Sequence, residues 1–111
     1  MTKRTLKSIL RNGGATLNQN GNAANIRGGY MVSRKEGGYI ITLDRYNKIS
    51  RAINKTMAKL RPFEFCGVWV SGGLVYIDIS VNIKQLAHAQ RFGAINEQLK
   101  IWDVENGREL A

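Results

Sequence analysis

The chain has 111 residues, with 17 Lys and Arg against eight Asp and Glu, for a formal net charge of +9. This length makes one domain, residues 1–111, and no apolar run approaches the roughly 20 residues that cross a bilayer. One cysteine, Cys66, and one histidine, His88, exclude a disulfide framework and any motif that needs two of either. Because the first residues also lack the apolar stretch of a signal peptide, we expect a cytoplasmic protein.

The first part of the chain predicts a helix followed by short strands. Residues 2–11 have apolar side chains at helical spacing, and Gly13-Gly14 ends the helix because glycine reaches positive φ without strain. Strands are expected at 15–18, 30–33 and 39–43, and turns at 20–21 and 36–38.

The clearest element is a helix over residues 45–61. Asp44 is expected to cap its N-terminus, and Pro62 ends it. Its apolar side consists of Tyr46, Ile49, Ile53, Met57 and Leu60.

A β-hairpin is predicted around Gly72-Gly73, with Trp69 opposite Tyr76 in its two strands, 65–70 and 74–83. Strand alternation gives it one aliphatic face, formed by Cys66, Val68, Val70, Val75, Ile77, Ile79 and Val81. The other face carries Phe65, Trp69, Leu74, Tyr76, Asp78 and Ser80.

The end of the chain predicts a second long helix and one last short element. The helix is expected to begin at Asn82, with Gln85 in a capping box. Its apolar stripe is His88, Phe92, Ile95 and Leu99. Residues 101–104 fit a last strand or a helix end. The order α-β-β-β-α-β-β-α predicts an α+β domain, in which helices pack on a curled antiparallel sheet.

Positive charge is concentrated in the first part of the chain. Residues 1–61 hold 13 basic and two acidic residues, for a net charge of +11, whereas residues 62–111 have a net charge of −2. Such a division produces a directional field that attracts polyanions. We therefore expect RNA or DNA, or an acidic patch on a protein, as the partner.

The central helix carries the most specific signal. Five cations, not interrupted by any acid, share one side: Arg45, Lys48, Arg51, Lys55 and Lys59. Like charges at i,i+4 repel, so an unmixed row favours docking of phosphates over a merely solvated basic surface. Further cations are candidates for the same interface: Lys3, Arg4, Lys7, Arg11, Arg27, Arg34 and Lys35.

The aromatic face of the hairpin has two interpretations. Phe65, Trp69 and Tyr76 would stack nucleobases if that face is exposed. A small domain needs apolar burial, however, so the favoured interpretation is that the C-terminal helix covers these rings.

The sequence shows no arrangement of residues that is typical of a catalytic site. Cys66 falls on the core face of its strand and His88 on an apolar stripe, so a nucleophile–base pair is not expected. The carboxylates show no metal-ligand spacing, and the glycine pairs form no phosphate-binding motif. We expect a protein that is not an enzyme and needs no cofactor.

Two resemblances bear on the partner. The order of elements over residues 2–61 is similar to that of a double-stranded RNA-binding domain, which also places cations on its last helix. The lysine cluster that begins that helix in the family is replaced here by Arg45 and Lys48. Residues 5–17 (TLKSILRNGGATL) and 29–33 (GYMVS) resemble small proteins of Gram-positive phages, plasmids and integrative elements.

Some proteins of that second group are anti-CRISPR inhibitors of Cas9. The resemblance implies a binding protein that acts on guide RNA or on assembly of the Cas9 ribonucleoprotein. The alternative is a DNA- or RNA-binding regulator or accessory protein of such an element. A monomer and a homodimer through the hairpin or the C-terminal helix fit the sequence equally well.

Overall fold

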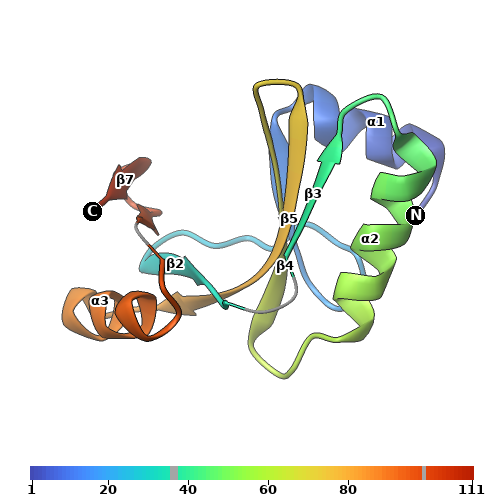
Figure 1. Cartoon of the computed structure of the whole chain (residues 1–111). Coiled ribbons are helices and arrows are strands. Elements are labelled where there is room, and N and C mark those ends of the chain that lie inside the picture. Colours follow the sequence, from blue (N-terminus) through green and yellow to red (C-terminus); the bar gives the residue numbers. More distant parts are fainter. Residues whose placement is uncertain (36–37, 99) are drawn as a thin grey trace.

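The computed structural model describes residues 1–35, 38–98 and 100–111 and forms one α+β domain (Figure 1). Three helices and seven strands follow in chain order within these described residues, which confirms the expected fold class; the last strand predicted as one alternative at 101–104 forms, and one further short strand is added after it. The elements are α1 (Lys3–Arg11), β1 (Gly14–Leu17), β2 (Tyr30–Ser33), β3 (Tyr39–Thr42), α2 (Tyr46–Ala58), β4 (Glu64–Ser71), β5 (Leu74–Ile83), α3 (Leu86–Ile95), β6 (Ile101–Asp103) and β7 (Arg108–Leu110).

The seven strands belong to one antiparallel sheet; six follow in the order β1-β4-β5-β2-β6-β7, and β3 pairs with β5 off this path. The β4–β5 hairpin has the predicted register, with Trp69 opposite Tyr76, and both glycines of its turn have positive φ. β2 and β3 do not pair with each other, because both bond to the same side of the long strand β5. The predicted turn between them falls partly on residues 36–37, which lie outside the described residues.

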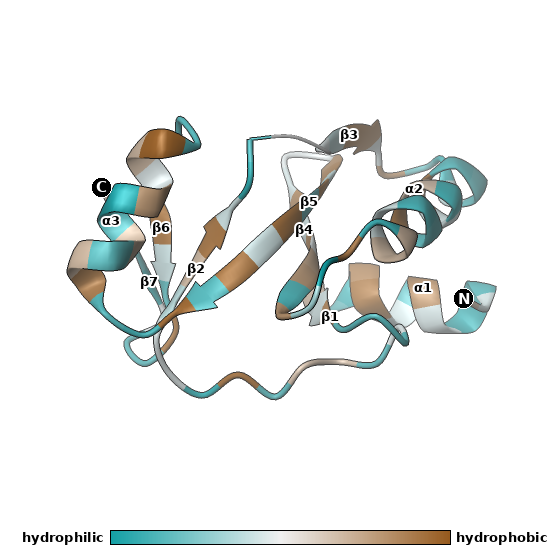
Figure 2. Ribbon diagram, turned by 90° about the horizontal axis from the view of Figure 1, so that it is seen from below, coloured by the Kyte–Doolittle hydropathy of each residue, from teal (hydrophilic) through white to brown (hydrophobic). Residues whose placement is uncertain are grey.

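The sheet bends along β5, so that β2, β6 and β7 stand at an angle to β1 and β4 (Figure 1). The helices lie outside this bend: α1 and α2 against β1, β4 and β5, and α3 against β2 and β6. We call the other side of the bent sheet its inner face. Figure 2 shows the alternation that separates the two faces as brown and paler bands along β5.

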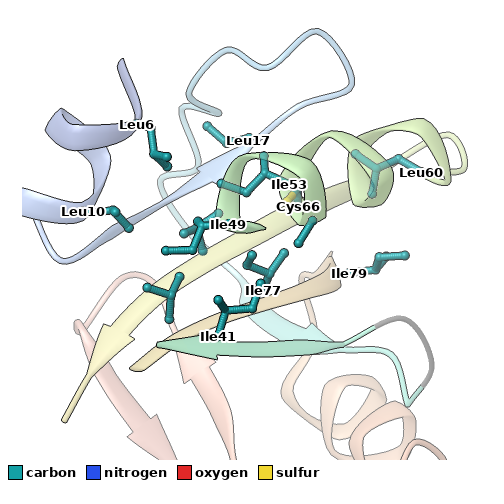
Figure 3. Packing of buried hydrophobic residues seen from close by; sticks show 13 residues of the cluster. Leu6, Leu10, Leu17, Ile41, Ile49, Ile53, Leu60, Cys66, Ile77 and Ile79 are labelled. Carbon is teal, nitrogen blue, oxygen red and sulfur yellow. The ribbon is translucent and has the colours of Figure 1, made fainter. Parts of the chain in front are cut away.

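The main core lies between α1, α2 and the sheet (Figure 3). Its fully buried side chains include Ile49 and Ile53 of α2 and Cys66, Ile77 and Ile79 of the hairpin. The predicted aliphatic face of the hairpin is therefore confirmed. A smaller second cluster, built on Val32, Ala89 and Ile101, lies under α3.

Two predicted helix starts are wrong. Arg45, not Asp44, is the N-cap residue of α2, because the backbone first closes a turn from the Arg45 amide to the carbonyl of Thr42. The last helix begins at Leu86 rather than at Asn82, because β2 pairs with β5 as far as Ile83 and keeps those residues extended.

The predicted apolar stripe of the last helix is wrong for His88 and Ile95, whereas Phe92 is half-buried and packs against the second cluster. His88 is exposed and Ile95 is 73% exposed, whereas Ala89 and Gly93 are the buried positions of α3. A Cβ at Gly93 would lie 3.4 Å from Ile101 Cγ2, so α3 approaches the sheet through small residues. Leu99 lies outside the described residues. Throughout the described ranges, no helix combines the length and the apolarity needed to cross a membrane.

Candidate nucleic-acid interface and the open inner face

Burial of one side of α2 fixes the orientation of its cations. Ile49, Ala52, Ile53 and Thr56 are buried, and the Thr56 hydroxyl donates to the Ala52 carbonyl at 2.8 Å, which satisfies it inside the core. Tyr46, which was predicted to lie on the buried side, is only half-buried. The helix is thus rotated relative to the prediction, and its cations lie along one flank of the buried side.

All five predicted cations of α2 are exposed, and we call them the α2 surface: Arg45, Lys48, Arg51, Lys55 and Lys59. None of the four ion pairs among the described residues includes any of them. Arg51 Nε makes only a long hydrogen bond, of 3.5 Å, to the backbone carbonyl of Asn47. The cations of the α2 surface are therefore not held in ion pairs by carboxylates of the described residues.

Helix α1 adds cations at the N-terminal end of α2. Lys3 lines a shallow hollow of about 360 Å³ together with Arg45, Lys48, Arg51 and one carboxylate, Asp44. Lys7 Nζ lies 5.8 Å from the ring centroid of Tyr46. Lys3 and Lys7 thus adjoin the α2 surface, as the sequence suggested. Arg4 and Arg11 are exposed on the same helix.

Arg34 and Lys35 are placed differently from the other candidates. Arg34 is 16% exposed, and its Nε lies 3.1 Å from Oε2 of the buried Glu64. Lys35 Nζ lies 3.0 Å from Glu97 Oε1. Both cations are therefore paired with carboxylates, which were not visible as partners in the sequence. Arg27 is exposed in the segment between β1 and β2.

Phe63 is a candidate that the sequence reasoning missed. Its side chain is 91% exposed, and its φ of +70° lies in the left-handed region. The turn that holds it follows α2 directly and is closed by a hydrogen bond of 2.7 Å from the Arg61 amide to Glu64 Oε1. A large apolar side chain that is both strained and exposed is a common mark of a functional position. In the sequence, Phe63 stood out only because it follows Lys59, Arg61 and Pro62.

The inner face of the sheet is open, contrary to the favoured prediction that the C-terminal helix covers it. α3 packs on β2, β5 and β6, outside the bend, so it leaves the Trp69 side chain 51% exposed. Trp69 and Tyr76 contact each other with ring centroids 5.4 Å apart. A groove of about 1150 Å³ runs over this face, and Trp102 of β6 also lines it. We call it the inner groove.

Asp78 lies in the inner groove as an acid among aromatic and small residues. Burial raises its pKa, while a 2.8 Å hydrogen bond from Ser33 Oγ to Oδ2 opposes that rise. Gly67 lies across the sheet from it, and a Cβ there would lie 2.4 Å from Asp78 Oδ1. Glycine is therefore what makes room for this carboxylate. The alternation of β5 had already placed Asp78 beside Tyr76, but only the bend of the sheet makes a groove there.

Cys66 and His88 are not brought together. Cys66 is fully buried under α2, and its burial, with a smaller contribution from Asp78, raises the pKa of the thiol to about 12. His88 is exposed on α3, which packs on the other cluster. Cys66 is therefore a protonated core side chain. Among the residues with described placement, no three His, Cys, Asp or Glu side chains are grouped as metal ligands would be.

No protein-family model, no curated protein sequence and no solved structure matches the chain.

Proposed function

We propose that this is a non-enzymatic binding protein that docks its α2 surface on the phosphate backbone of RNA in the cytoplasm. The observation that carries the proposal is the exposed, acid-free row of five cations on α2, which none of the described ion pairs neutralises. Arg51, Lys55 and Lys59 follow one another at i,i+4, a spacing at which like charges destabilise a helix. Phosphates bound along the row would remove that repulsion and release counterions.

The size and surroundings of the α2 surface fit a nucleic acid backbone. The 13 residues of α2 extend about 20 Å, which is the length of several phosphates along a strand. Lys3 and Lys7 enlarge the positive area at one end, and the exposed ring of Phe63 lies just beyond the other end. An aromatic ring beside cations is the combination that binds single-stranded RNA, because bases stack on the ring.

The resemblance to small proteins of Gram-positive mobile elements makes the proposal more specific. We take the RNA to be a Cas9 guide RNA, and the activity to be inhibition of that effector by interference with assembly of its ribonucleoprotein. A basic inhibitor suits this mode, since the guide of about 20 nucleotides is held through its backbone.

The test uses two double variants with the same net charge. Lys48→Glu/Lys55→Glu changes the α2 surface, whereas Lys84→Glu/Arg91→Glu changes exposed cations on the far side of the molecule. Each lowers the formal net charge from +9 to +5, because every Lys or Arg replaced by Glu removes two units. We expect the first to weaken binding of guide RNA by about tenfold or more and to abolish inhibition of DNA cleavage by Cas9. The second should retain most of both.

Different results identify other functions. Equal loss of binding in both double variants would reject the α2 surface. Tight binding to unrelated RNA or DNA, without inhibition of Cas9, would instead show a nucleic-acid-binding regulator of a mobile element.

A further inference from the structure

The inner groove lies on the other side of the sheet from α2 and has different chemistry. Its walls are Trp69 and Tyr76 of the β4–β5 hairpin and Trp102 of β6, with Asp78 and Ser33 between them. Its volume of about 1150 Å³ exceeds the range of about 300–1,000 Å³ that is typical of small-molecule sites. This size favours a segment of polypeptide over a small metabolite.

Charge in the inner groove is opposite to that of the molecule. Among its described lining residues there are three carboxylates, Asp78, Glu97 and Glu109, and one ammonium group, Lys100. Two of the carboxylates are paired with lysines: Lys100 Nζ lies 3.1 Å from Glu109 Oε2, and Lys35 Nζ lies 3.0 Å from Glu97 Oε1. Asp78 is the lining carboxylate that none of the ion pairs of the described residues includes, and it makes the groove complementary to a cation.

The aromatic rings favour an organic cation. Trp69 and Tyr76 are tilted by 39° to each other, and half of the Trp69 surface is open to the groove side of the sheet. The face of an aromatic ring attracts a guanidinium group, and Trp does so best. Asp78 follows Tyr76 by two residues on the same face of β5, a separation of about 7 Å along a strand. One guanidinium can therefore contact the ring and the carboxylate together.

The Asp78 carboxylate is held ready for such a partner. Ser33 Oγ donates to Oδ2, while Oδ1 packs against Gly67 in the place that a Cβ would occupy. None of the recorded ion pairs of the described residues includes Asp78. A half-buried carboxylate without a cation is unfavourable for folding alone and becomes favourable when a guanidinium binds.

We propose that the inner groove binds an arginine-bearing segment of a protein partner, whose guanidinium stacks on the Trp69–Tyr76 pair and donates to Asp78. A nucleotide fits the rings but not the charge of the groove, because its phosphate would approach the Asp78 carboxylate. This site is separate from the α2 surface, so the protein has two binding faces, one for phosphates and one for a cationic peptide.

The intrinsic fluorescence of the protein provides a direct test. The chain has two tryptophans, Trp69 and Trp102, and both line the groove. We would titrate the full chain with a hexa-arginine peptide, and with hexa-citrulline as an uncharged peptide of the same shape. We expect hexa-arginine to shift the tryptophan fluorescence in a saturable way, although the whole protein is positively charged. Hexa-citrulline should bind at least tenfold more weakly.

Two variants locate the binding. Asp78→Asn keeps the acceptor for Ser33 and removes the charge, and it should weaken hexa-arginine binding by about tenfold. Glu105→Gln removes an exposed carboxylate that does not line the groove and should bind like the original protein. Trp69→Leu, followed through Trp102, should also weaken binding.

Several results would overturn the proposal. These are no response to hexa-arginine, equal weakening in Asp78→Asn and Glu105→Gln, or a uridine hexanucleotide that gives the same shift with the same dependence on Asp78. The proposal is distinguishable from the proposed function: Lys48→Glu/Lys55→Glu should keep hexa-arginine binding, and Asp78→Asn should keep RNA binding.

Discussion

Two residues in this protein depart from what folding alone favours, and each lies on a different candidate surface. Phe63 exposes a large ring in a left-handed conformation, in the turn after α2. Asp78 places a carboxylate among aromatic side chains, where burial raises its pKa. Local departures of this kind persist where they serve binding, because the rest of the domain offsets their cost.

The Phe63 ring is expected to stack on a base of single-stranded RNA. Replacing it with Ala should weaken binding of single-stranded RNA by about 1–3 kcal/mol and leave binding of a duplex nearly unchanged, because paired bases are not accessible. Fluorescence anisotropy with labelled single-stranded and duplex RNA measures both. Since the ring is exposed, thermal unfolding should show little loss of stability, and equal weakening for the two RNAs would exclude stacking.

The raised pKa of Asp78 predicts how stability depends on pH. Below the ordinary pKa of 3.8, the carboxyl is protonated in both the folded and the unfolded chain, and no difference arises. As the pH rises above that value, the unfolded chain ionises first, so stability is lost until the folded-state carboxyl also ionises. Asp78→Asn removes this loss.

The Asp78→Asn variant should therefore unfold at a higher temperature than the original protein at pH 7, with a difference that shrinks toward pH 3. Thermal unfolding at both pH values measures the change. A variant that is less stable at pH 7 would show that the Asp78 charge has a favourable partner within the fold.

At the scale of elements, apolar spacing predicted the buried side of α2 better than that of α3. In α2, large apolar residues at helical spacing correctly predicted the buried Ile49 and Ile53, although Ala52 and Thr56 complete the buried side. In α3, the same reasoning failed, because Ala89 and Gly93 face the sheet while Ile95 points outward. Short side chains allow a helix to approach a sheet closely, so the buried side of such a helix is not its most hydrophobic one.

The packing of α3 predicts opposite effects at neighbouring positions. Ala89→Leu should destabilise the protein by about 1–3 kcal/mol, because the added carbon atoms have no space under the helix. Ile95→Lys should change the free energy of unfolding by no more than about 0.5 kcal/mol, because the side chain is in solvent. Urea unfolding compares the two, and a large loss with Ile95→Lys would mean that α3 uses its apolar stripe after all.

At the scale of the whole molecule, the sheet separates two surfaces of different charge. The helices α1 and α2 carry the cations on one side, and the inner groove gathers carboxylates and both tryptophans on the other. The net charge of +9 therefore describes neither surface by itself. What a partner meets depends on the side from which it approaches.

This arrangement predicts that local charge, and not net charge, governs the salt dependence of RNA binding. If each of the five cations of the α2 surface neutralises one phosphate, the slope of log K against log salt for single-stranded RNA should be about −3.5, and about −2 in Lys48→Glu/Lys55→Glu. The control Lys84→Glu/Arg91→Glu should keep the slope of the original protein, although its net charge equals that of Lys48→Glu/Lys55→Glu. Equal slopes in the two variants would indicate a diffuse charge effect.

The sequence by itself determined the elements whose signals are local. Helical spacing located α2, the glycine pair of the hairpin set its register, and alternation along β5 separated an aliphatic from an aromatic face. It also determined that the cations of α2 are not accompanied by acids within the helix. These features depend on residues within about ten positions of each other, where periodicity and turn geometry act directly.

Only the tertiary structure decided what these faces meet. It paired β2 and β3 with the same strand, bent the sheet along β5, and placed α3 outside the bend, which left the aromatic face open as a groove. It also paired Arg34 with Glu64, 30 positions away, and so removed one predicted cation from the interface. Such choices depend on shape complementarity between distant segments, which no local pattern of residues encodes.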